Sequence, residues 1–238
     1  MSKVCIAICN YNHQKFLSDS IKSALNQDYE DLDVVVVDDG STNQKEVVDI
    51  VEEIKDPRFR HIILPKNRGK WNALNAAFSS TSATICTSHD ADDISLSWRV
   101  SSQVKVMMET QTIHNLCGFV HCWNENDVLE NITNSCPDNL RFISKEETFG
   151  LVAMGYQTPG INHYYTGNFE TAGVSSMFMK WLWDVGMRYN PPNIGLRVRH
   201  SEDSDFNTRM TLTLRSTSIL AEKPYLYRRN TSTNKEET

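Results

Sequence analysis

Short apolar segments alternate with segments of helical periodicity through the first half of the chain, and this alternation restricts the fold more than any other feature. Continuous apolar runs, which suit strands buried on both faces, occupy residues 4–8, 32–37, 60–64, 83–87 and 116–122. Each of the first four is followed by a segment whose apolar side chains recur every three or four residues. Strands that alternate with helices predict an α/β fold with a mostly parallel, doubly wound αβα sheet.

Polar clusters follow these strands at the points where the strands end. Three such clusters are residues 9–12, 38–42 and 90–93. A fourth polar loop, residues 67–70, opens a helix and lies on the same rim if the winding is regular. Because ligands of doubly wound sheets bind beyond the carboxyl ends of the strands, we expect these clusters to form one site.

The cluster after the fourth strand holds three carboxylates within four positions, Asp90, Asp92 and Asp93. At an effective dielectric constant near 20, each close pair of such charges repels by roughly 4 kcal/mol, so a cation is expected among them. Oxygen ligands suit hard divalent cations such as Mg²⁺ or Mn²⁺, which commonly share their coordination shell with substrate phosphates. The alternative is that Asp92 or Asp93 caps a helix that begins near Ser95.

Composition limits the class of protein. The chain has 238 residues, which suits one large domain, and its net charge of −6 disfavours a nucleic-acid-binding domain. No apolar run is long enough to span a bilayer, and the N-terminus lacks a signal-peptide core. The six cysteines show no C-x-x-C spacing of a zinc site. We therefore expect a soluble cytoplasmic protein, with association at the cytosolic face of a membrane left open.

The second half of the chain is less regular. From about Asp127 to Gly173 the alternation fades into loops with many aromatic residues, which predicts an irregular lobe over the same rim rather than disorder. Residues 177–187 return to a helical pattern, and residues 231–238 form a polar tail that we expect to be frayed.

Eight segments, in order, resemble the motifs of family 2 glycosyltransferases of the GT-A fold. They are residues 4–12, 23–29, 36–42 (VVDDGST), 67–76, 89–93 (HDADD), 177–186, 200–205 and 225–229. Only residues 127–173 lack a clear counterpart. The resemblance implies a single GT-A domain over residues 1–238, with a half that binds a nucleotide sugar (1–125) and a half that binds the acceptor and holds the catalytic residues (126–230).

The same resemblance implies roles for the acidic cluster. Segment 89–93 is similar to the family's DXD-type metal motif, in which Asp92 would bind Mn²⁺ or Mg²⁺ directly. Asp90 would contact the ribose or the water molecules of the metal, and Asp93 the sugar or a loop. The donor would be a nucleotide sugar, with UDP favoured and GDP possible.

Further donor contacts are implied by the resemblance at the other polar clusters. Asp39 would accept a ring N–H of the base, Tyr11 would stack on that base, and Cys9, where the family often has Thr, would act through its backbone. Lys70 would face the phosphates, with Asn67 on the same loop. The alternatives are that Asp39 only caps the following helix and that Lys70 is a surface lysine without a role.

Asp203 is the implied catalytic residue, because Glu202 and Asp203 match the family's "ED" motif. Inverting transfer needs a general base that takes the proton of the acceptor hydroxyl, and such a base typically contributes ~10²–10⁴-fold to the rate. Glu202 would assist it or contact the acceptor. The alternative is that both are ordinary acidic residues in the first turn of a helix.

The leading hypothesis is an inverting, metal-dependent glycosyltransferase that moves a sugar from a nucleotide-sugar donor to a hydroxyl of a glycan or other acceptor. A sugar-phosphate nucleotidyltransferase would need a loop rich in glycine and basic residues after the first strand, and residues 9–12 offer none. A module that binds sugar nucleotides without transferring them is a third possibility, against which the intact acidic motifs argue.

Overall fold

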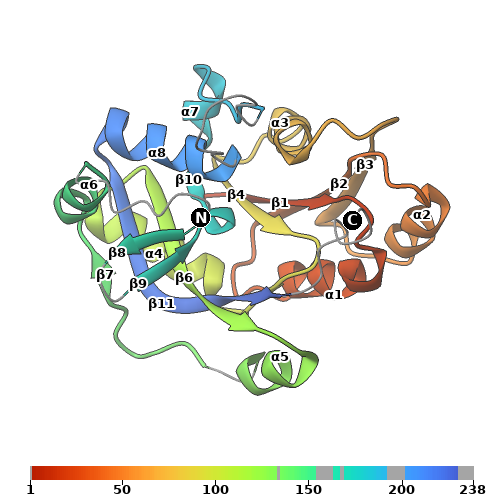
Figure 1. Ribbon diagram of the computed structural model, residues 1–238, viewed down its shortest axis with the longest axis horizontal. Helices are drawn as coiled ribbons and strands as arrows, with labels where there is room; N and C mark the ends of the chain where they lie inside the picture. Colours follow the sequence, from red (N-terminus) through yellow and green to blue (C-terminus); the bar gives the residue numbers. More distant parts are fainter. Residues whose placement is uncertain (1, 133–134, 154–162, 167–168, 192–201, 230–238) are drawn as a thin grey trace, which may run out of the picture.

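The computed structural model describes residues 2–132, 135–153, 163–166, 169–191 and 202–229. The strands are β1 Val4–Asn10, β2 Leu32–Asp38, β3 Phe59–Ile63, β4 Ile85–Asp90, β5 Ile94–Ser95, β6 His114–Cys122, β7 Phe142–Ile143, β8 His163–Thr166, β9 Phe169–Ala172, β10 Met177–Met179 and β11 Thr217–Arg228 (Figure 1). The helices are α1 Gln14–Leu25, α2 Gln44–Glu52, α3 Lys70–Ser79, α4 Arg99–Thr110, α5 Glu125–Ile132, α6 Lys145–Ala153, α7 Lys180–Asp184 and α8 Glu202–Leu214.

The central sheet has the strand order β3-β2-β1-β4-β10-β6-β11-β5. β1 pairs in parallel with β2 and β4, β2 pairs in parallel with β3, and β6 pairs in parallel with β11. β10 is antiparallel to both β4 and β6. The β8–β9 hairpin attaches to β6 through Gly118 and Thr171. The predicted α/β fold with a mostly parallel sheet is confirmed.

Two hydrophobic cores lie on the two faces of the sheet. Ile6 and Ile8 of β1 point into one core with buried side chains of α1, α2 and α4. Cys5 and Ala7, on the opposite face of the same strand, point into the other core with α3, α7 and α8. Figure 1 shows α3, α7 and α8 together on one side of the sheet. Alternation along strands buried on both faces explains why they read as continuous apolar runs.

The helix expected over residues 177–187 is wrong in its first three residues. These form β10, and the helix α7 covers only Lys180–Asp184. The reason is that Met177 and Phe178 fill opposite cores, Met177 with α1 and α4 and Phe178 with α3 and α8. Neighbouring side chains reach opposite faces of a sheet only in an extended strand.

Neither predicted cap of a helix by an aspartate is found. α2 is capped by Asn43, whose side chain accepts the backbone N–H of Glu46. Residues 94–95 form β5, and α4 begins at Arg99. Asp39, Asp92 and Asp93 therefore cap neither helix. None of the described helices is long and apolar enough to cross a membrane.

Phe78 provides a test of the core beneath α3. Its ring makes edge contacts with Phe178 and Trp183, at centroid distances of 5.3 and 5.5 Å, and it is fully buried. Phe78→Ala should lower the free energy of unfolding by about 3–5 kcal/mol, because the cavity left behind adds to the lost burial. Urea denaturation measures this loss. The matched control is Phe142→Ala on β7, where the ring is 45% exposed and a loss below about 1 kcal/mol is expected; equal losses would contradict the assignment of the core.

Candidate active site

The carboxyl ends of β1 and β2 are joined by a buried hydrogen-bond network around Asp38. Its Oδ1 accepts hydrogen bonds from Asn10 Nδ2 at 2.7 Å and Ser41 Oγ at 2.5 Å, and its Oδ2 accepts the backbone N–H of Ser41 at 3.0 Å. Asn12 donates its own N–H to Ser41 Oγ. Since all polar atoms of Asp38 point inward, this residue organises the two loops rather than offering a ligand contact.

The next residue, Asp39, positions the loop that leads into α3. Its carboxylate accepts the backbone N–H of Arg68 at 3.1 Å and that of Gly69 at 2.6 Å. Gly40 has a φ of +72°, and a Cβ there would lie 2.4–2.5 Å from the backbone of Lys66 and Asn67, so only glycine allows this close approach. Burial of the Asp39 carboxyl raises its pKa, while the two N–H donors lower it. The Asp39 carboxylate thus holds the loop before α3, and it is the same group that is expected to bind the nucleobase of the donor.

Two other residues expected at the donor site lie on the same rim. The side chain of Asn67 is exposed, and its Oδ1 accepts the N–H of Gly69 at 2.8 Å. Tyr11 is half-buried on the loop after β1. Asn67 is linked to Asp39 through the N–H of Gly69, and Tyr11 follows Asn10, whose carbonyl oxygen accepts the Asp39 N–H. Their contacts with a donor stay predictions.

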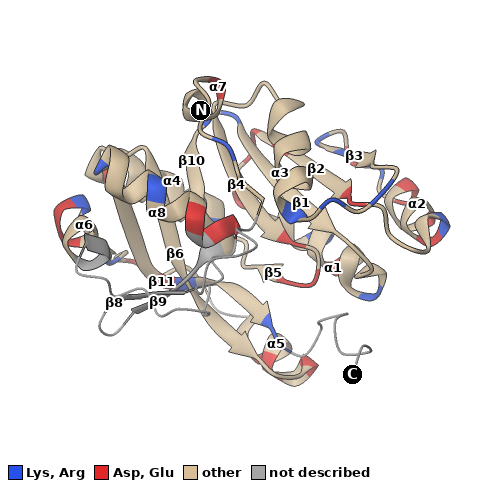
Figure 2. Cartoon of the chain, turned by 45° about the horizontal axis from the view of Figure 1, so that its top comes forward, with Lys and Arg blue, Asp and Glu red and all other residues tan. Residues whose placement is uncertain are grey.

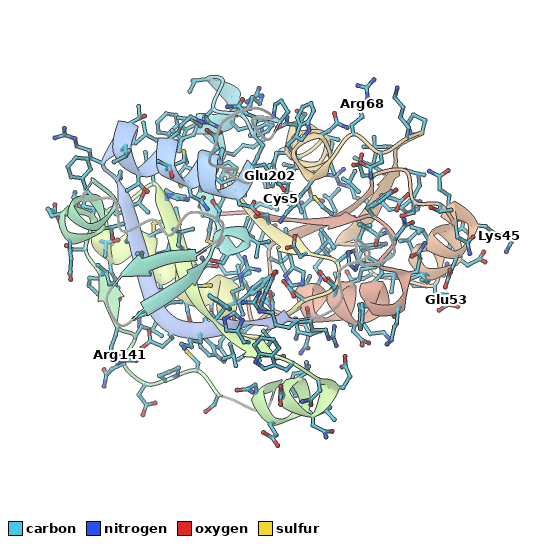
Figure 3. All side chains as sticks on the ribbon, viewed as in Figure 1. Cys5, Lys45, Glu53, Arg68, Arg141 and Glu202 are labelled. Carbon is cyan, nitrogen blue, oxygen red and sulfur yellow. The ribbon has the colours of Figure 1, made fainter. Side chains whose placement is uncertain are left out.

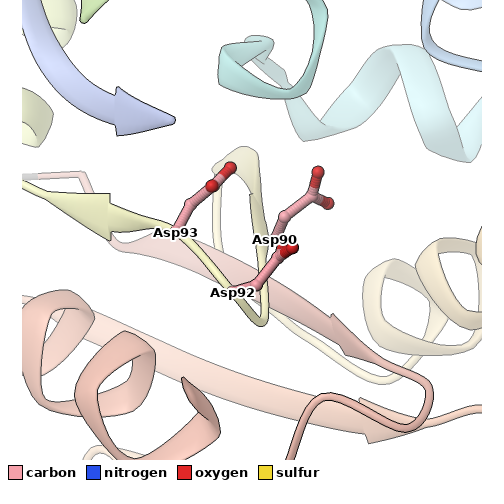
Figure 4. Close-up of side chains that lie close together, drawn as sticks. All are labelled: Asp90, Asp92 and Asp93. Atoms are coloured by element: carbon pink, nitrogen blue, oxygen red, sulfur yellow. The ribbon is translucent and has the colours of Figure 1, made fainter. Parts of the chain in front are cut away.

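Asp90, Asp92 and Asp93 form an acidic cluster in the tight turn between β4 and β5 (Figure 4). One carboxylate oxygen of each lies within 4.8 Å of the others, which is the spacing of a shared cation. The three residues differ in their other contacts. Asp93 is fully buried, and its oxygens accept hydrogen bonds from Tyr225 Oη at 2.8 Å and from the Arg228 N–H at 2.9 Å. Asp93 therefore fastens β11 to the turn.

Asp90 and Asp92 are the better candidates for metal ligands. Their side chains are 23% and 17% exposed, whereas Asp93 has none of its surface exposed. Asp92 Oδ2 lies 3.7 Å from His13 Nδ1. An all-oxygen donor set in a partly open turn fits Mg²⁺ or Mn²⁺, with Asp90 and Asp92 as the residues that would hold the ion.

Lys70 connects this cluster to the second half of the chain. It is the first residue of α3, and its Nζ lies 2.6 Å from Asp90 Oδ1 and 3.0 Å from Asp203 Oδ2. Burial lowers the pKa of Lys70, but the carboxylates of Asp203, Asp90 and Glu202 outweigh this and hold it well above its usual value. Lys70 is a partly buried cation bound between two carboxylates rather than a surface lysine without contacts.

Cys9 lies beside this ion pair. It is the register partner of Asp90 on neighbouring parallel strands, so the two side chains share one face of the sheet. Burial raises the pKa of its thiol well above the usual value, and the nearby carboxylates of Asp90, Asp203 and Asp39 add to this effect. The side chain is thus a neutral thiol at the floor of the site.

Asp203 and Glu202 begin α8 at the same point. Figure 2 shows the acidic start of α8 in red, and Asp203 there contacts the Lys70 ammonium. The Asp203 side chain is buried, and its Oδ1 has no hydrogen-bond partner among the described residues. Burial raises the pKa of Asp203 to about 6, with Lys70 lowering it and Glu202 and Asp90 raising it. A partnerless oxygen on a carboxyl of this pKa is suited to accept a proton near neutral pH.

Glu202 is less enclosed than Asp203. Figure 3 shows it in the middle of the molecule near the start of α8, while Arg68 points outward from the loop before α3. The two acidic residues of the expected "ED" motif thus have different surroundings. His200 and Ser201, which precede them in that motif, lie outside the described residues.

Tyr225 and Arg228 of β11 support the acidic turn, and the sequence analysis assigned them no role. Besides its bond to Asp93, Tyr225 Oη accepts the backbone N–H of Asp90 at 3.1 Å. Arg228 Nη1 donates to the carbonyl oxygen of Asp92 at 3.1 Å. The resemblance of segment 225–229 to a family motif is the sequence signal that points to Tyr225 and Arg228. For His13, next to Asp92, the sequence offers no comparable signal.

Removal of the Lys70 ammonium should destabilise the protein more at high pH than at low pH. Because the folded pKa of Asp203 is about 6 against an ordinary 3.8, the native state holds a proton that the unfolded chain releases, and stability falls as the pH rises between these values. In Lys70→Met the pKa rises further, so the loss extends above pH 6. Urea denaturation in EDTA should show about 3–5 kcal/mol lost at pH 8 and clearly less at pH 5.

The control for this variant is Lys45→Met, which removes an exposed ion pair with Asp49. Its effect should stay below about 1 kcal/mol at both pH values. A loss in Lys70→Met that does not depend on pH would show that the ammonium does not govern the ionisation of Asp203.

Comparisons with known proteins identify the family and the fold of this chain. The family model described as "Glycosyl transferase family 2" matches residues 5–184. An uncharacterised glycosyltransferase of Nostoc sp. is 32% identical over 120 residues, which covers 50% of this chain and 36% of the relative. The matched region spans less than two thirds of the length of that relative and of two uncharacterised glycosyltransferases of Haemophilus influenzae.

Solved structures show the same fold. S. aureus TarS (residues 1–349), in complex with UDP-GlcNAc, is similar with a TM-score of 0.66 and 17% identity, over 96% of this chain and 59% of TarS. The mannosyltransferase PcManGT of Pyrobaculum calidifontis, in complex with GDP-Man and Mn²⁺, is similar with a TM-score of 0.61 and 17% identity, over 98% and 58%. These neighbours confirm the GT-A fold. The family match, which covers more than half of the residues, shows that the chain belongs to glycosyl transferase family 2.

Proposed function

We propose that this glycosyltransferase moves a sugar from a nucleotide-sugar donor to a hydroxyl group of a glycan or other acceptor, with inversion at the sugar C1 and dependence on a divalent cation. A UDP-sugar is the favoured donor and a GDP-sugar the second choice. Residues 1–125 would bind the donor, and residues 126–230 would bind the acceptor and supply the base. Six free cysteines suit a reducing compartment, and we place the reaction in the cytoplasm.

The observation that carries the proposal is the position of Lys70 between Asp90 and Asp203. One Nζ atom contacts both the acidic turn and the first turn of α8, although the two aspartates are 113 positions apart (203 − 90). A single ammonium group therefore lies between the candidate base and Asp90, one of the two candidate metal ligands. Transfer needs this proximity, because the base acts on an oxygen that attacks a carbon bound to the metal-associated diphosphate.

Donor binding is assigned to the loops at the ends of β1 and β2. Asp39 would accept the N–H of the base, Tyr11 would stack on its ring, and Asn67 would contribute from the loop before α3. Cys9 would contribute through its backbone, since its neutral thiol lies against the ion pair. The UDP-GlcNAc bound by TarS and the GDP-Man bound by PcManGT support a nucleotide sugar but do not separate the two bases.

The metal would be Mn²⁺ or Mg²⁺, held by Asp92 and Asp90, while Asp93 would act mainly through its hold on β11. When bound, the ion supplies positive charge that stabilises the diphosphate leaving group. Lys70 would provide a second positive charge near the phosphates. The Mn²⁺ of PcManGT and the spacing of the acidic cluster support this assignment.

Asp203 would act as the general base through Oδ1, the oxygen without a partner. The acceptor O–H gives its proton to Asp203, the acceptor oxygen forms a bond to C1, and the bond from C1 to the phosphate oxygen breaks, so that the nucleoside diphosphate leaves. With a pKa of about 6, the carboxyl is mostly ionised at neutral pH and ready to accept this proton. Glu202 would assist by orienting the acceptor. Of the two alternatives drawn from the sequence, nucleotidyltransfer and binding without transfer, neither is supported by the comparisons.

Asp203→Asn tests the base. Sugar transfer should fall by ~10²–10⁴-fold, because the amide cannot take the proton, whereas donor affinity measured by calorimetry should change little. Turnover is measured as nucleoside diphosphate released from a panel of UDP- and GDP-sugars with Mn²⁺. Asp205→Asn is the matched control, since Asp205 lies in the same first turn of α8 but pairs with Arg209. Unchanged turnover in Asp203→Asn would remove this residue from the role.

Asp92→Asn tests the metal site. With UDP present, Mn²⁺ should raise the melting temperature of the wild type, because ligands that bind only the native state stabilise it by mass action. This rise should be lost in Asp92→Asn and kept in Asp205→Asn. An equal rise in all three proteins would mean that the acidic turn does not hold the ion.

A further inference from the structure

Three pairs of side chains form a column on one face of β6 and β11. Phe119 is the register partner of Tyr225, and His121 is the partner of Tyr227. Paired residues of parallel strands point to the same face, and residues two positions apart along a strand do so as well. The rings make contact along and across the strands, with centroids 4.6 Å apart for Phe119 and His121 and 5.8 Å apart for Phe119 and Tyr227.

Trp123 and Arg229 complete this aromatic column, which consists of Phe119, His121, Trp123, Tyr225, Tyr227 and Arg229. The backbone N–H of Arg229 donates to the Cys122 carbonyl oxygen at 2.8 Å, which extends the pairing of the two strands. The Arg229 guanidinium lies 5.6 Å from the centroid of the Trp123 ring and 5.0 Å from that of Tyr227. Its Nε donates to His121 Nδ1 at 2.9 Å.

The column begins at the acidic turn and ends in solvent. At its inner end, Tyr225 is fully buried and its hydroxyl donates to Asp93. At its outer end, Trp123 is 60% exposed. The backbone between Tyr227 and Arg229 is fixed to the same turn, because the Arg228 N–H donates to Asp93 Oδ1. A row of contacting rings therefore runs from the buried side of the candidate metal site, where Phe119 and Tyr225 lie in the core, to the exposed Trp123.

The position of the column in the sheet separates it from the donor loops. In the strand order β2-β1-β4-β10-β6-β11, the proposed base contacts lie at β1 and β2, and the acidic turn follows β4. The column lies at β6 and β11, on the other side of that turn. A donor whose diphosphate lies at the turn and whose base lies at β1 and β2 leaves this side for the second substrate.

We propose that the aromatic column is the acceptor subsite and that it binds a pyranose ring of a saccharide acceptor against the indole of Trp123. The inference rests on the proposed function, since it names the acceptor class of the same site. An exposed tryptophan offers a large, rigid apolar face that matches the C–H face of a sugar. The Arg229 guanidinium, which lies between the rings of Trp123 and Tyr227, would provide N–H donors for the hydroxyl oxygens of the sugar.

Ligand-detected NMR tests this inference on the full chain, with UDP and Mg²⁺ present. The probes are the methyl glycosides of glucose, galactose, mannose and N-acetylglucosamine, and the signal is saturation transferred from protein to sugar protons. At least one probe should bind to the wild type, and Trp123→Ala should weaken its binding by about ten-fold or more. Trp123→Phe should recover part of the affinity, because it restores an aromatic face.

The matched control is Trp181→Ala. Trp181 is 49% exposed, but it lies on α7 directly after β10, whose last residue, Met179, pairs with Ile85 at the start of β4. Trp181 is therefore at the opposite end of β4 from the acidic turn, and its removal should leave the sugar signal unchanged. Replacement of Mg²⁺ by Mn²⁺ should then broaden the bound sugar resonances in the wild type but not in Asp92→Asn, which places the sugar near the metal.

Two results would overturn the inference: no probe saturated by the wild type, or equal saturation in Trp123→Ala and the wild type. Calorimetry of UDP with Mg²⁺ on the same samples separates this failure from a failure of the proposed function. UDP binding without sugar binding removes only the acceptor subsite, whereas absence of nucleotide and nucleotide-sugar binding removes the proposed function itself. Melting curves of each variant establish that it is folded.

Discussion

The contact of one ammonium group with two carboxylates holds the two halves of this site together. Asp90 ends a strand of the first half, Asp203 opens a helix of the second half, and Lys70 Nζ lies within 3.0 Å of both. Without the ammonium, the buried Asp203 carboxyl and the partly exposed Asp90 carboxylate would face each other, and their repulsion would act on the start of α8. Phe206 and Met210 hold α8 against the core, and Lys70 holds its first turn close to the acidic turn.

A second constraint divides the acidic turn between structure and chemistry. Asp93 accepts hydrogen bonds from Tyr225 and from the backbone of Arg228, so its carboxyl group holds β11 against the turn. The three aspartates are therefore not equivalent. Asp90 and Asp92 have partly exposed carboxylates that can bind an ion, whereas the Asp93 carboxyl is buried. The same hydrogen bonds hold Tyr225 and the backbone next to Tyr227 and Arg229 in place. Asp93 therefore supports both the acidic turn and the strand that carries the proposed acceptor surface.

Local sequence patterns were sufficient to predict the features that depend on neighbouring residues. Alternating apolar and helical segments predict the parallel sheet, and the convergence of strand ends predicts that residues 9–12, 38–42 and 90–93 meet. These patterns carry no information about pairing across the chain. The contact of Lys70 with Asp203 spans 133 positions, and that of Asp93 with Tyr225 spans 132. β10 was missed for a similar reason. Met177 and Phe178 form a strand because they pair with β4 and β6 on either side, and this pairing is not visible in the local sequence.

The ion pair also bears on how the base would gain strength during the proposed reaction. The ammonium of Lys70 lowers the pKa of Asp203, while burial and the neighbouring carboxylates raise it, and the balance is a pKa of about 6. A diphosphate at the acidic turn offers Lys70 a partner of greater negative charge than one carboxylate. A Lys70 side chain that turned toward the phosphates would leave Asp203 without the group that lowers its pKa, and Asp203 would then be a stronger base. Arrival of the donor would thus increase the proton affinity of Asp203 at the moment when an acceptor hydroxyl has to be deprotonated.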